Sequence, residues 1–212
     1  GFFQEVTGLA ARAVPSSELI LSAGTYLPRN RPAALVAFSR SGTTTETVTA
    51  CRLHREAGRG PVIGVTCHPG SDLEQQADIA ITLPGADDQS VVMTSSFSSM
   101  LLAAFMVAAT LGDSDALRSE LAALPAQLER DLEALRSRGE TLGADRQWSQ
   151  FVFLGIGPFL GVAYEAMLKL KEMTQVPCEA YSPLDFRHGP ISIMGKGTMA
   201  VLLDSDRAAA HE

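Results

Sequence analysis

One short apolar run constrains the fold of this chain more than any other feature of its sequence. Residues Ala33 to Phe38 (AALVAF) carry no polar side chain, and they lie between Arg-Asn-Arg-Pro and Ser-Arg-Ser-Gly. A continuous apolar run bounded by turn-forming residues is typical of a strand that is buried on both faces of a parallel sheet. The run therefore predicts a sheet with helices packed against both of its faces.

Strand-like and helix-like segments alternate along the rest of the chain. A helix is expected to begin at Thr43, which stands three residues before Glu46 as in a capping box, and to end at Gly58. The other predicted strands are 18–21, 61–66, 79–83, 151–154 and 199–203, and the other predicted helices are 2–13, 71–76, 95–111, 115–138 (broken near Pro125) and 161–173. This alternation predicts an α/β fold with a doubly wound parallel sheet.

The pattern begins again in the second half of the chain. The run Phe151–Leu154 is followed by Gly155, Gly157 and Gly161, as at the start of a second strand–loop–helix unit. We therefore predict two domains, at 1–140 and 148–212, joined by a connector near 138–147. Both are expected to be partial, because the first opens on a helix without a preceding strand and the second stops just after one.

Composition narrows the classes of function. Among the 212 residues, 46% are hydrophobic and 19% charged, which predicts a packed globular protein. The formal net charge of −7 argues against binding nucleic acid by bulk electrostatics. The most apolar stretch, Val91–Thr110, has serines and threonines in its first half, so it predicts a buried helix and no membrane contact. No secretory signal is visible, and we predict a cytoplasmic protein.

The three cysteines predict neither a disulfide framework nor a metal site. Cys51, Cys67 and Cys178 form no close CxxC pair, and their number is odd. They are expected to be reduced, partly buried thiols.

The segment Ser39-Arg40-Ser41-Gly42-Thr43-Thr44 is the most informative local motif. It follows a predicted buried strand and opens a predicted helix, where parallel sheets commonly bind ligands. Backbone N–H groups and the dipole at a helix N-terminus attract anions, and the hydroxyls and the arginine would add donors. The motif therefore predicts a phosphate site inside an acidic protein. The alternative is an ordinary helix cap with extra serines.

Two features of the second half suit acid–base chemistry. Glu165, Lys169 and Glu172 are spaced i, i+4, i+7 and share one face of a predicted helix. Taken alone, they also fit a solvated face with salt bridges. His188 precedes Gly-Pro and so lies in a turn, where most histidines are ordinary surface residues. Together with a phosphate site, these residues indicate proton transfer on a sugar phosphate.

Four segments carry a resemblance to sugar isomerase (SIS) domains. FSRSGTTTET resembles their phosphate-binding signature. FLGIGPFLGVAYEAMLKLKE and EAYSPLDFRHGP resemble the second SIS domain in the isomerase half of glucosamine-6-phosphate synthase. VVMTSSFSSMLLAA is more similar to the tagatose-6-phosphate ketose/aldose isomerase family, which includes amino-sugar-phosphate deaminases.

The resemblance implies a flavodoxin-like three-layer fold with two SIS domains per subunit. It implies that Glu172 moves a proton between C1 and C2 through an enediol, that His188 opens the sugar ring, and that Lys169 lies near the reacting carbons. In the family this histidine comes from a neighbouring subunit, so a homodimer with a shared active site is implied. The implied phosphate ligands are Ser39, Ser41 and Thr44, with Arg40 also lining the site.

One departure from the family adds two candidate ligands. Met93 stands where the synthase has a serine beside its substrate, which leaves Thr94 and Ser95 as nearby candidates. The function expected on this basis is a phosphosugar isomerase that acts on aldose and ketose (amino)sugar phosphates, without metal or organic cofactor. The alternatives are an amino-sugar-phosphate deaminase, the isomerase half of an amidotransferase, and a non-catalytic regulator that senses sugar phosphates.

Overall fold

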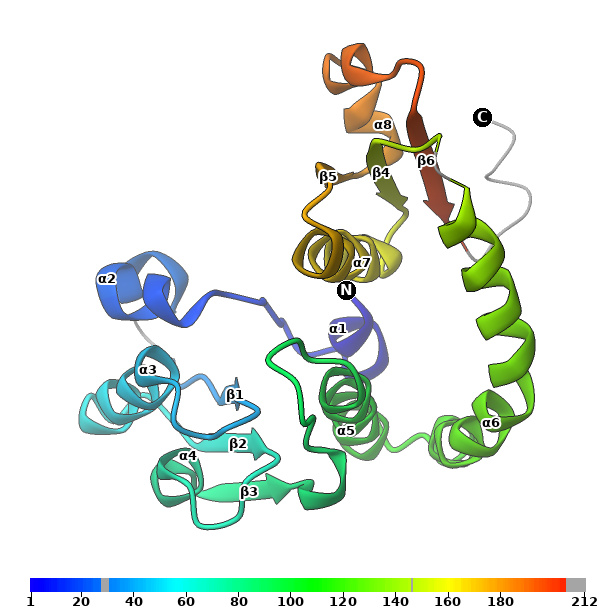
Figure 1. The fold of residues 1–212 in the computed structure, drawn as a ribbon. Helices are drawn as coiled ribbons and strands as arrows, with labels where there is room; N and C mark the ends of the chain where they lie inside the picture. The colour runs from blue at the N-terminus through cyan, green and yellow to red at the C-terminus, as the bar shows by residue number, and fades with distance from the viewer. Residues whose placement is uncertain (28–30, 146, 205–212) are drawn as a thin grey trace. The chain divides into compact units, whose positions relative to one another are not determined.

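The computed structural model describes residues 1–27, 31–145 and 147–204, which divide into two compact units (Figure 1). The N-terminal unit is Phe3–Leu121, and the C-terminal unit is Ala122–Glu212 together with Gly1–Phe2. Each contains a three-stranded sheet in which all pairs are parallel. The α/β class is thus confirmed. The domain boundaries 1–140 and 148–212 stay a prediction, and residues 205–212 lie outside the described residues.

The sheet of the N-terminal unit has the order β1-β2-β3. Its strands are β1 (Leu35–Phe38), β2 (Val62–Thr66) and β3 (Ile79–Thr82). The crossover helices α3 (Thr45–Glu56) and α4 (Asp72–Gln76) join them in sequence. The loops that follow the three strands therefore leave from one edge of the sheet, where a ligand site is expected.

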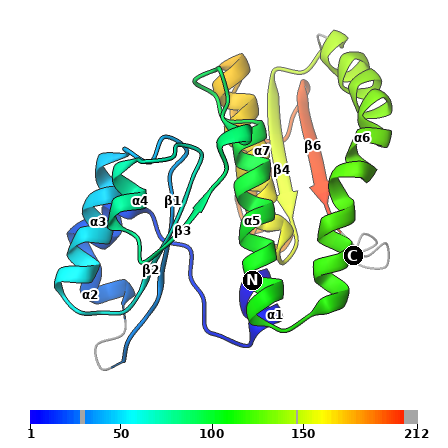
Figure 2. The same ribbon diagram turned by 90° about the horizontal axis from the view of Figure 1, so that it is seen from below.

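Helices cover both faces of this sheet. Ala37 and Val62 pack with Cys51 of α3 and Leu73 of α4 on one face. Val65 packs with Met100 of α5 (Ser95–Leu111) in a second cluster, which Val36 and Ile81 join. In Figure 2, α3 and α4 lie on one side of the strands and α5 on the other. Neighbouring strand residues point to opposite faces, so one apolar run supplies both cores.

The first helices differ from the sequence-based expectation. Residues 18–21 form no strand; they belong to helix α2 (Ser16–Tyr26), which is kinked at Ser22. Helix α1 ends at Thr7 (Phe2–Thr7), earlier than expected. A four-residue apolar run fits a helix as well as a strand, and tertiary contacts decide between them. Here the hydroxyls of Ser16 and Thr47, 3.1 Å apart, link α2 to α3.

The expected break near Pro125 is absent. Helix α6 runs continuously over Asp115–Ala144 with Pro125 inside it, and it takes in most of the predicted connector. A proline removes one helix hydrogen bond, but many of its neighbours here are strong helix formers such as Ala, Leu, Glu and Arg. Among the described residues, no helix is long and apolar enough to cross a bilayer.

The sheet of the C-terminal unit has the order β5-β4-β6. Its strands are β4 (Gln150–Gly155), β5 (Cys178–Tyr181) and β6 (Thr198–Leu203). Strand β5 was not predicted, because CEAY carries only a short alternating pattern. The remaining elements are α7 (Phe159–Thr174), α8 (Pro183–Phe186) and the 3-10 helices η1 (Pro84–Ala86) and η2 (Pro190–Ile193). Helix α7 packs against β4 and β5.

All three cysteines lie within the described residues. Cys51, Cys67 and Cys178 are free, and they are fully buried where partly buried thiols were expected. Burial raises the pKa of the Cys51 thiol to about 11, so this thiol stays protonated at neutral pH.

Candidate functional site

The hydroxyl-rich loop after β1 forms a compact turn in front of α3. The hydroxyl oxygens of Ser39 and Thr44 are 2.8 Å apart and share a hydrogen bond. The Gly42 N–H donates to Ser39 Oγ at 3.1 Å, and the Thr43 N–H donates to Ser41 Oγ at 3.2 Å. Helix α3 begins at Thr45 without a side-chain cap, so the predicted capping box of Thr43 and Glu46 is not formed. The first turn of the helix therefore keeps backbone N–H groups for a ligand.

Neighbouring segments fix the shape of this loop. The Arg40 carbonyl accepts hydrogen bonds from Thr66 Oγ1 at 3.1 Å and from the Cys67 N–H at 2.9 Å. Gly42 has a φ of +65°, and a Cβ built on it would lie 2.1 Å from Ser71 Oγ. The loop needs glycine here for both its backbone conformation and its close packing.

The loop is suited to hold a phosphate ester. Ser39, Ser41 and Thr44 bring three hydroxyls to the N-terminal end of α3, at the carboxyl edge of the sheet. Ser39 is buried, which keeps its hydroxyl in one position, whereas Thr44 is exposed. Such an arrangement supplies hydrogen-bond donors and a favourable dipole without an excess of cationic residues. We refer to residues 39–44 as the cradle loop.

The Arg40 side chain points toward the loop between β3 and α5. Its Nη1 donates to the Ser90 carbonyl at 2.7 Å, and its Nε lies 3.8 Å from a carboxylate oxygen of Asp87. The other Asp87 oxygen is 3.1 Å from His68 Nε2. Arg40 therefore joins the cradle loop to a second loop at the same sheet edge.

Thr94 and Ser95, the other candidate ligands, bind a carboxylate of the protein itself. Asp88 accepts hydrogen bonds from the N–H groups and the hydroxyls of three consecutive residues, at distances from 2.5 to 3.1 Å: Thr94, Ser95 and Ser96. Hydrogen bonds from the Ser96 and Ser95 hydroxyls, and from Thr94, hold the pKa of Asp88 far below its usual range. Asp88 thus caps α5. Sequence reasoning missed it, although an aspartate shortly before Thr-Ser-Ser at a helix start is a detectable signal.

Replacing Asp88 with asparagine is expected to lower the melting temperature by several degrees at pH 7. The lowered pKa means that the stabilising carboxylate is present above the unfolded-state value of about 3.9 and is lost as pH falls toward the folded-state value. The difference between wild type and variant should therefore shrink below about pH 4 in thermal melts. Asp131→Asn removes an exposed carboxylate on α6 and is the matched control. Equal melting temperatures for Asp88→Asn and wild type at pH 7 would contradict the capping role.

The acid–base candidates of the C-terminal unit meet on α7. Lys169 Nζ lies 2.7 Å from Glu172 Oε2 and 3.5 Å from Glu165 Oε1. Burial alone would lower the pKa of Lys169, but the hydrogen bond to Glu172 and the charges of Glu165 and Glu172 raise it overall. The predicted common face is confirmed, with a lysine that stays charged between two carboxylates.

Glu172 lies near the C-terminal end of α7. Helix α7 starts at the carboxyl end of β4 and leads to the start of the parallel strand β5. Its last turn therefore lies at the amino ends of these strands. His188 is exposed in the turn after α8, where its N–H donates to the Asp185 carbonyl at 3.0 Å. Within the described part of the chain, its ring makes no hydrogen bond or ion pair with Lys169 or Glu172.

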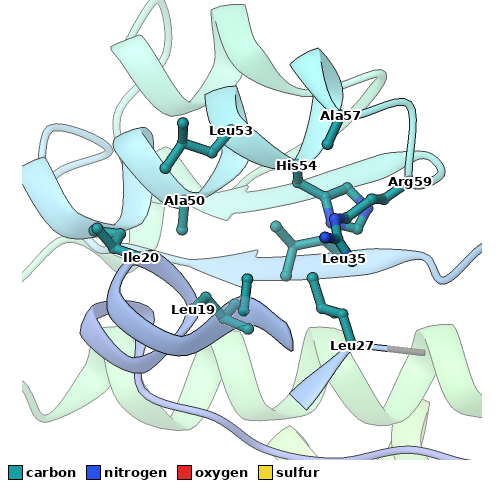
Figure 3. A pocket seen from close by; sticks show the side chains of 10 residues that line it. Leu19, Ile20, Leu27, Leu35, Ala50, Leu53, His54, Ala57 and Arg59 are labelled. Atoms are coloured by element: carbon teal, nitrogen blue, oxygen red, sulfur yellow. The ribbon is translucent and has the colours of Figure 1, made fainter. Parts of the chain in front are cut away.

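A pocket between α2 and α3 lies away from the cradle loop. It has a volume of about 170 Å³. Its lining is mainly aliphatic and also includes the side chains of His54 and Arg59 (Figure 3). His54 is 3% exposed and its Nε2 bonds the Ala33 carbonyl at 2.9 Å. Burial lowers the pKa of His54, so the ring is neutral at pH 7. His54 lies near the end of α3, and Ala33 lies just before β1. The pocket is therefore at the amino ends of the strands, opposite the edge that carries the cradle loop.

The parallel sheets define the class of an open α/β protein, and a hydroxyl-rich loop precedes an uncapped helix at one edge of its N-terminal sheet. The family comparison agrees with this class. The model of the SIS domain matches residues 2–110, just over half of the chain. The chain belongs to the SIS domain family.

Relatives and solved structures refine the comparison. The chain is 30% identical over 208 residues to a glutamine–fructose-6-phosphate aminotransferase (isomerizing) of Vibrio vulnificus, covering 91% of this chain and 33% of that protein. It resembles the crystal structure of glucosamine-6-phosphate deaminase from Thermotoga maritima, with a TM-score of 0.80 and 27% identity over 99% of this chain and 65% of that one. For the tagatose-6-phosphate ketose/aldose isomerase of Escherichia coli, the TM-score is 0.81 with 28% identity over 95% and 56%. The chain thus spans only about one to two thirds of these proteins.

Proposed function

We propose that this protein binds a sugar phosphate at the cradle loop and interconverts its aldose and ketose forms. The observation that carries the proposal is the hydroxyl-lined loop at the uncapped start of α3, in a chain of the SIS domain family. The similarity to proteins named for tagatose 6-phosphate, fructose 6-phosphate and glucosamine 6-phosphate supports a hexose phosphate as substrate.

The proposed reaction uses side chains alone. The phosphate is anchored by Ser39, Ser41 and Thr44, and His188 opens the sugar ring. Glu172 then removes the proton from C2 of the aldose and returns it to C1, through an enediolate whose negative charge Lys169 stabilises, while the hydroxyl proton passes from O2 to O1. The 2.7 Å contact between Lys169 and Glu172 supports this pairing, since it places a cation beside the proposed base, where the charge of the enediolate would develop.

Two subunits are proposed to share the active site. The proposal follows the resemblance to SIS domain enzymes, in which the ring-opening histidine comes from a neighbouring subunit. A homodimer in the cytoplasm, in which His188 comes from the partner, is part of this proposal. It predicts a dimer in solution by light scattering.

Deamination of an amino-sugar phosphate is the second candidate. The similarity to the Thermotoga maritima deaminase favours it, and release of ammonia from C2 needs the same anchor and related proton transfers. Ketose formation from hexose 6-phosphates and ammonia release from glucosamine 6-phosphate and galactosamine 6-phosphate, measured side by side, separate the two reactions.

Removing a cradle hydroxyl is expected to weaken sugar-phosphate binding. A hydrogen bond to a charged group contributes about 1.5–3 kcal/mol, so Ser39→Ala or Thr44→Val should raise the Kd for fructose 6-phosphate about 10- to 100-fold in calorimetric titrations. Ser98→Ala is the control, because Ser98 Oγ donates to the Thr94 carbonyl within α5, at 3.2 Å, and is not part of the cradle loop. Unchanged affinity in both cradle variants, or no binding of any hexose phosphate by the wild type, would refute the proposed site.

A further inference from the structure

Arg40 is the cradle loop's only cationic side chain, and its guanidinium contacts groups outside that loop. Nη1 donates to the Ser90 carbonyl at 2.7 Å, and Nε faces Asp87 at 3.8 Å. The side chain is 23% exposed, so it is partly shielded from water while held there. Its backbone, in contrast, is fixed in the loop by the hydrogen bonds to the Arg40 carbonyl.

Asp87 is the acidic partner that holds this guanidinium. One of its oxygens faces Arg40 Nε, and the other lies 3.1 Å from His68 Nε2. The adjacent carboxylate of Asp88 plays no such part, because its hydrogen bonds from Thr94, Ser95 and Ser96 commit it to the start of α5. Asp87 is therefore the carboxylate that competes with an incoming anion for Arg40.

We propose that Asp87 is a positioning residue that limits the affinity of the cradle loop for phosphate by holding the Arg40 guanidinium away from it. This inference rests on the proposed function of the cradle loop. A phosphate dianion bound beside Ser39 and Ser41 attracts the guanidinium, which reaches it by rotation of the flexible side chain while the backbone stays in place. Binding then requires Arg40 to leave Asp87 and Ser90, and the free energy of those contacts is subtracted from the affinity.

Removing the Asp87 charge should strengthen phosphate binding. Partly exposed ion pairs are weak, so Asp87→Asn should lower the Kd for inorganic phosphate and for fructose 6-phosphate about two- to fivefold in calorimetric titrations. In the background of Arg40→Gln, the same Asp87→Asn change should have no such effect. Asp115→Asn, which removes a carboxylate paired with Arg118, is the control and should bind like the wild type.

The double-variant cycle separates this mechanism from simple repulsion. If Asp87→Asn tightens binding equally with and without Arg40, the carboxylate acts only by repelling the phosphate, and the proposal is overturned. Unchanged or weaker binding in Asp87→Asn overturns it as well. Failure of the wild type to bind either probe would instead refute the phosphate site itself.

A wild-type measurement keeps the proposal testable if the variant does not fold. The Arg40 Nε–H resonance, assigned by its loss in Arg40→Gln, should shift as phosphate saturates the wild-type protein. A resonance that stays in place at saturation means that the guanidinium keeps its contact with Asp87, and this result overturns the proposal.

Discussion

Replacing Glu172 with glutamine is expected to lower turnover about 10²- to 10⁴-fold while sugar-phosphate binding survives. Glutamine keeps the size of the side chain and its hydrogen bond to Lys169, but it cannot accept the proton that moves between the two carbons. The anchor for the phosphate is a different part of the chain, so the Kd for the substrate should change little. The measurements are kcat, for the reaction that the wild type catalyses, and the Kd for the substrate, from a calorimetric titration.

Glu165→Gln is the matched control for this experiment. Glu165 lies on the same face of α7 and also pairs with Lys169, at 3.5 Å, but the resemblance assigns it no catalytic role. We expect its kcat to stay within about tenfold of the wild type, because one charge partner of Lys169 remains. If the two variants lose the same activity, the lysine–carboxylate network matters as a whole and Glu172 is not the specific base. If Glu172→Gln turns over normally, Glu172 is not the base at all.

Gly42→Ala is expected to destabilise the N-terminal unit by about 2–4 kcal/mol and to abolish measurable phosphate binding. The residue has a φ of +65°, which disfavours any side chain. A Cβ would also lie 2.1 Å from Ser71 Oγ and 2.8 Å from Thr66 Oγ1, so the loop must move away from α4 or β2. The expected loss is a large fraction of the stability of a domain, and denaturant unfolding measures it.

Gly58→Ala separates backbone strain from crowding. Gly58 follows the C-cap residue of α3 and has a φ of +59°, but a Cβ there meets no atom within 4 Å. This variant should lose about 1–2 kcal/mol through strain alone and should bind phosphate like the wild type. If Gly42→Ala costs no more than Gly58→Ala, the close contact with Ser71 has no energetic consequence. If Gly42→Ala still binds phosphate normally, the cradle loop tolerates displacement and its proposed role is wrong.

The sequence predicted regular elements best where a long local pattern existed. The helix expected at 95–111 is α5 with the same bounds (Ser95–Leu111), and the apolar run up to Phe38 is the strand β1. Two short segments were predicted wrongly: residues 18–21 are helical in α2, and strand β5 was missed. Four residues are too few to distinguish the periodicity of a helix from that of a strand. Contacts with distant segments then decide which of the two forms.

In the candidate site, too, the sequence predicted what a contiguous motif carries and missed the contacts between distant residues. The cradle loop was predicted because its residues are contiguous and follow a strand, and the structure gathers the hydroxyls of Ser39 and Thr44 as expected. Asp88 and Asp87 were not predicted as parts of the site. The first stands six residues before Thr94 and the second forty-seven after Arg40, and only folding brings each carboxylate to its partners.

By itself, the sequence determined the α/β class, the SIS resemblance and the position of the hydroxyl-rich loop, since periodicity and contiguous motifs are local properties of a chain. Only the tertiary structure decided which groups these hydroxyls and cations contact. Thr94 and Ser95 donate to Asp88, and Arg40 is held by Asp87 and Ser90. Hydrogen bonds and ion pairs act over a few ångströms, and the loops that make them are brought that close only when the strands assemble in parallel and place their carboxyl ends at one edge.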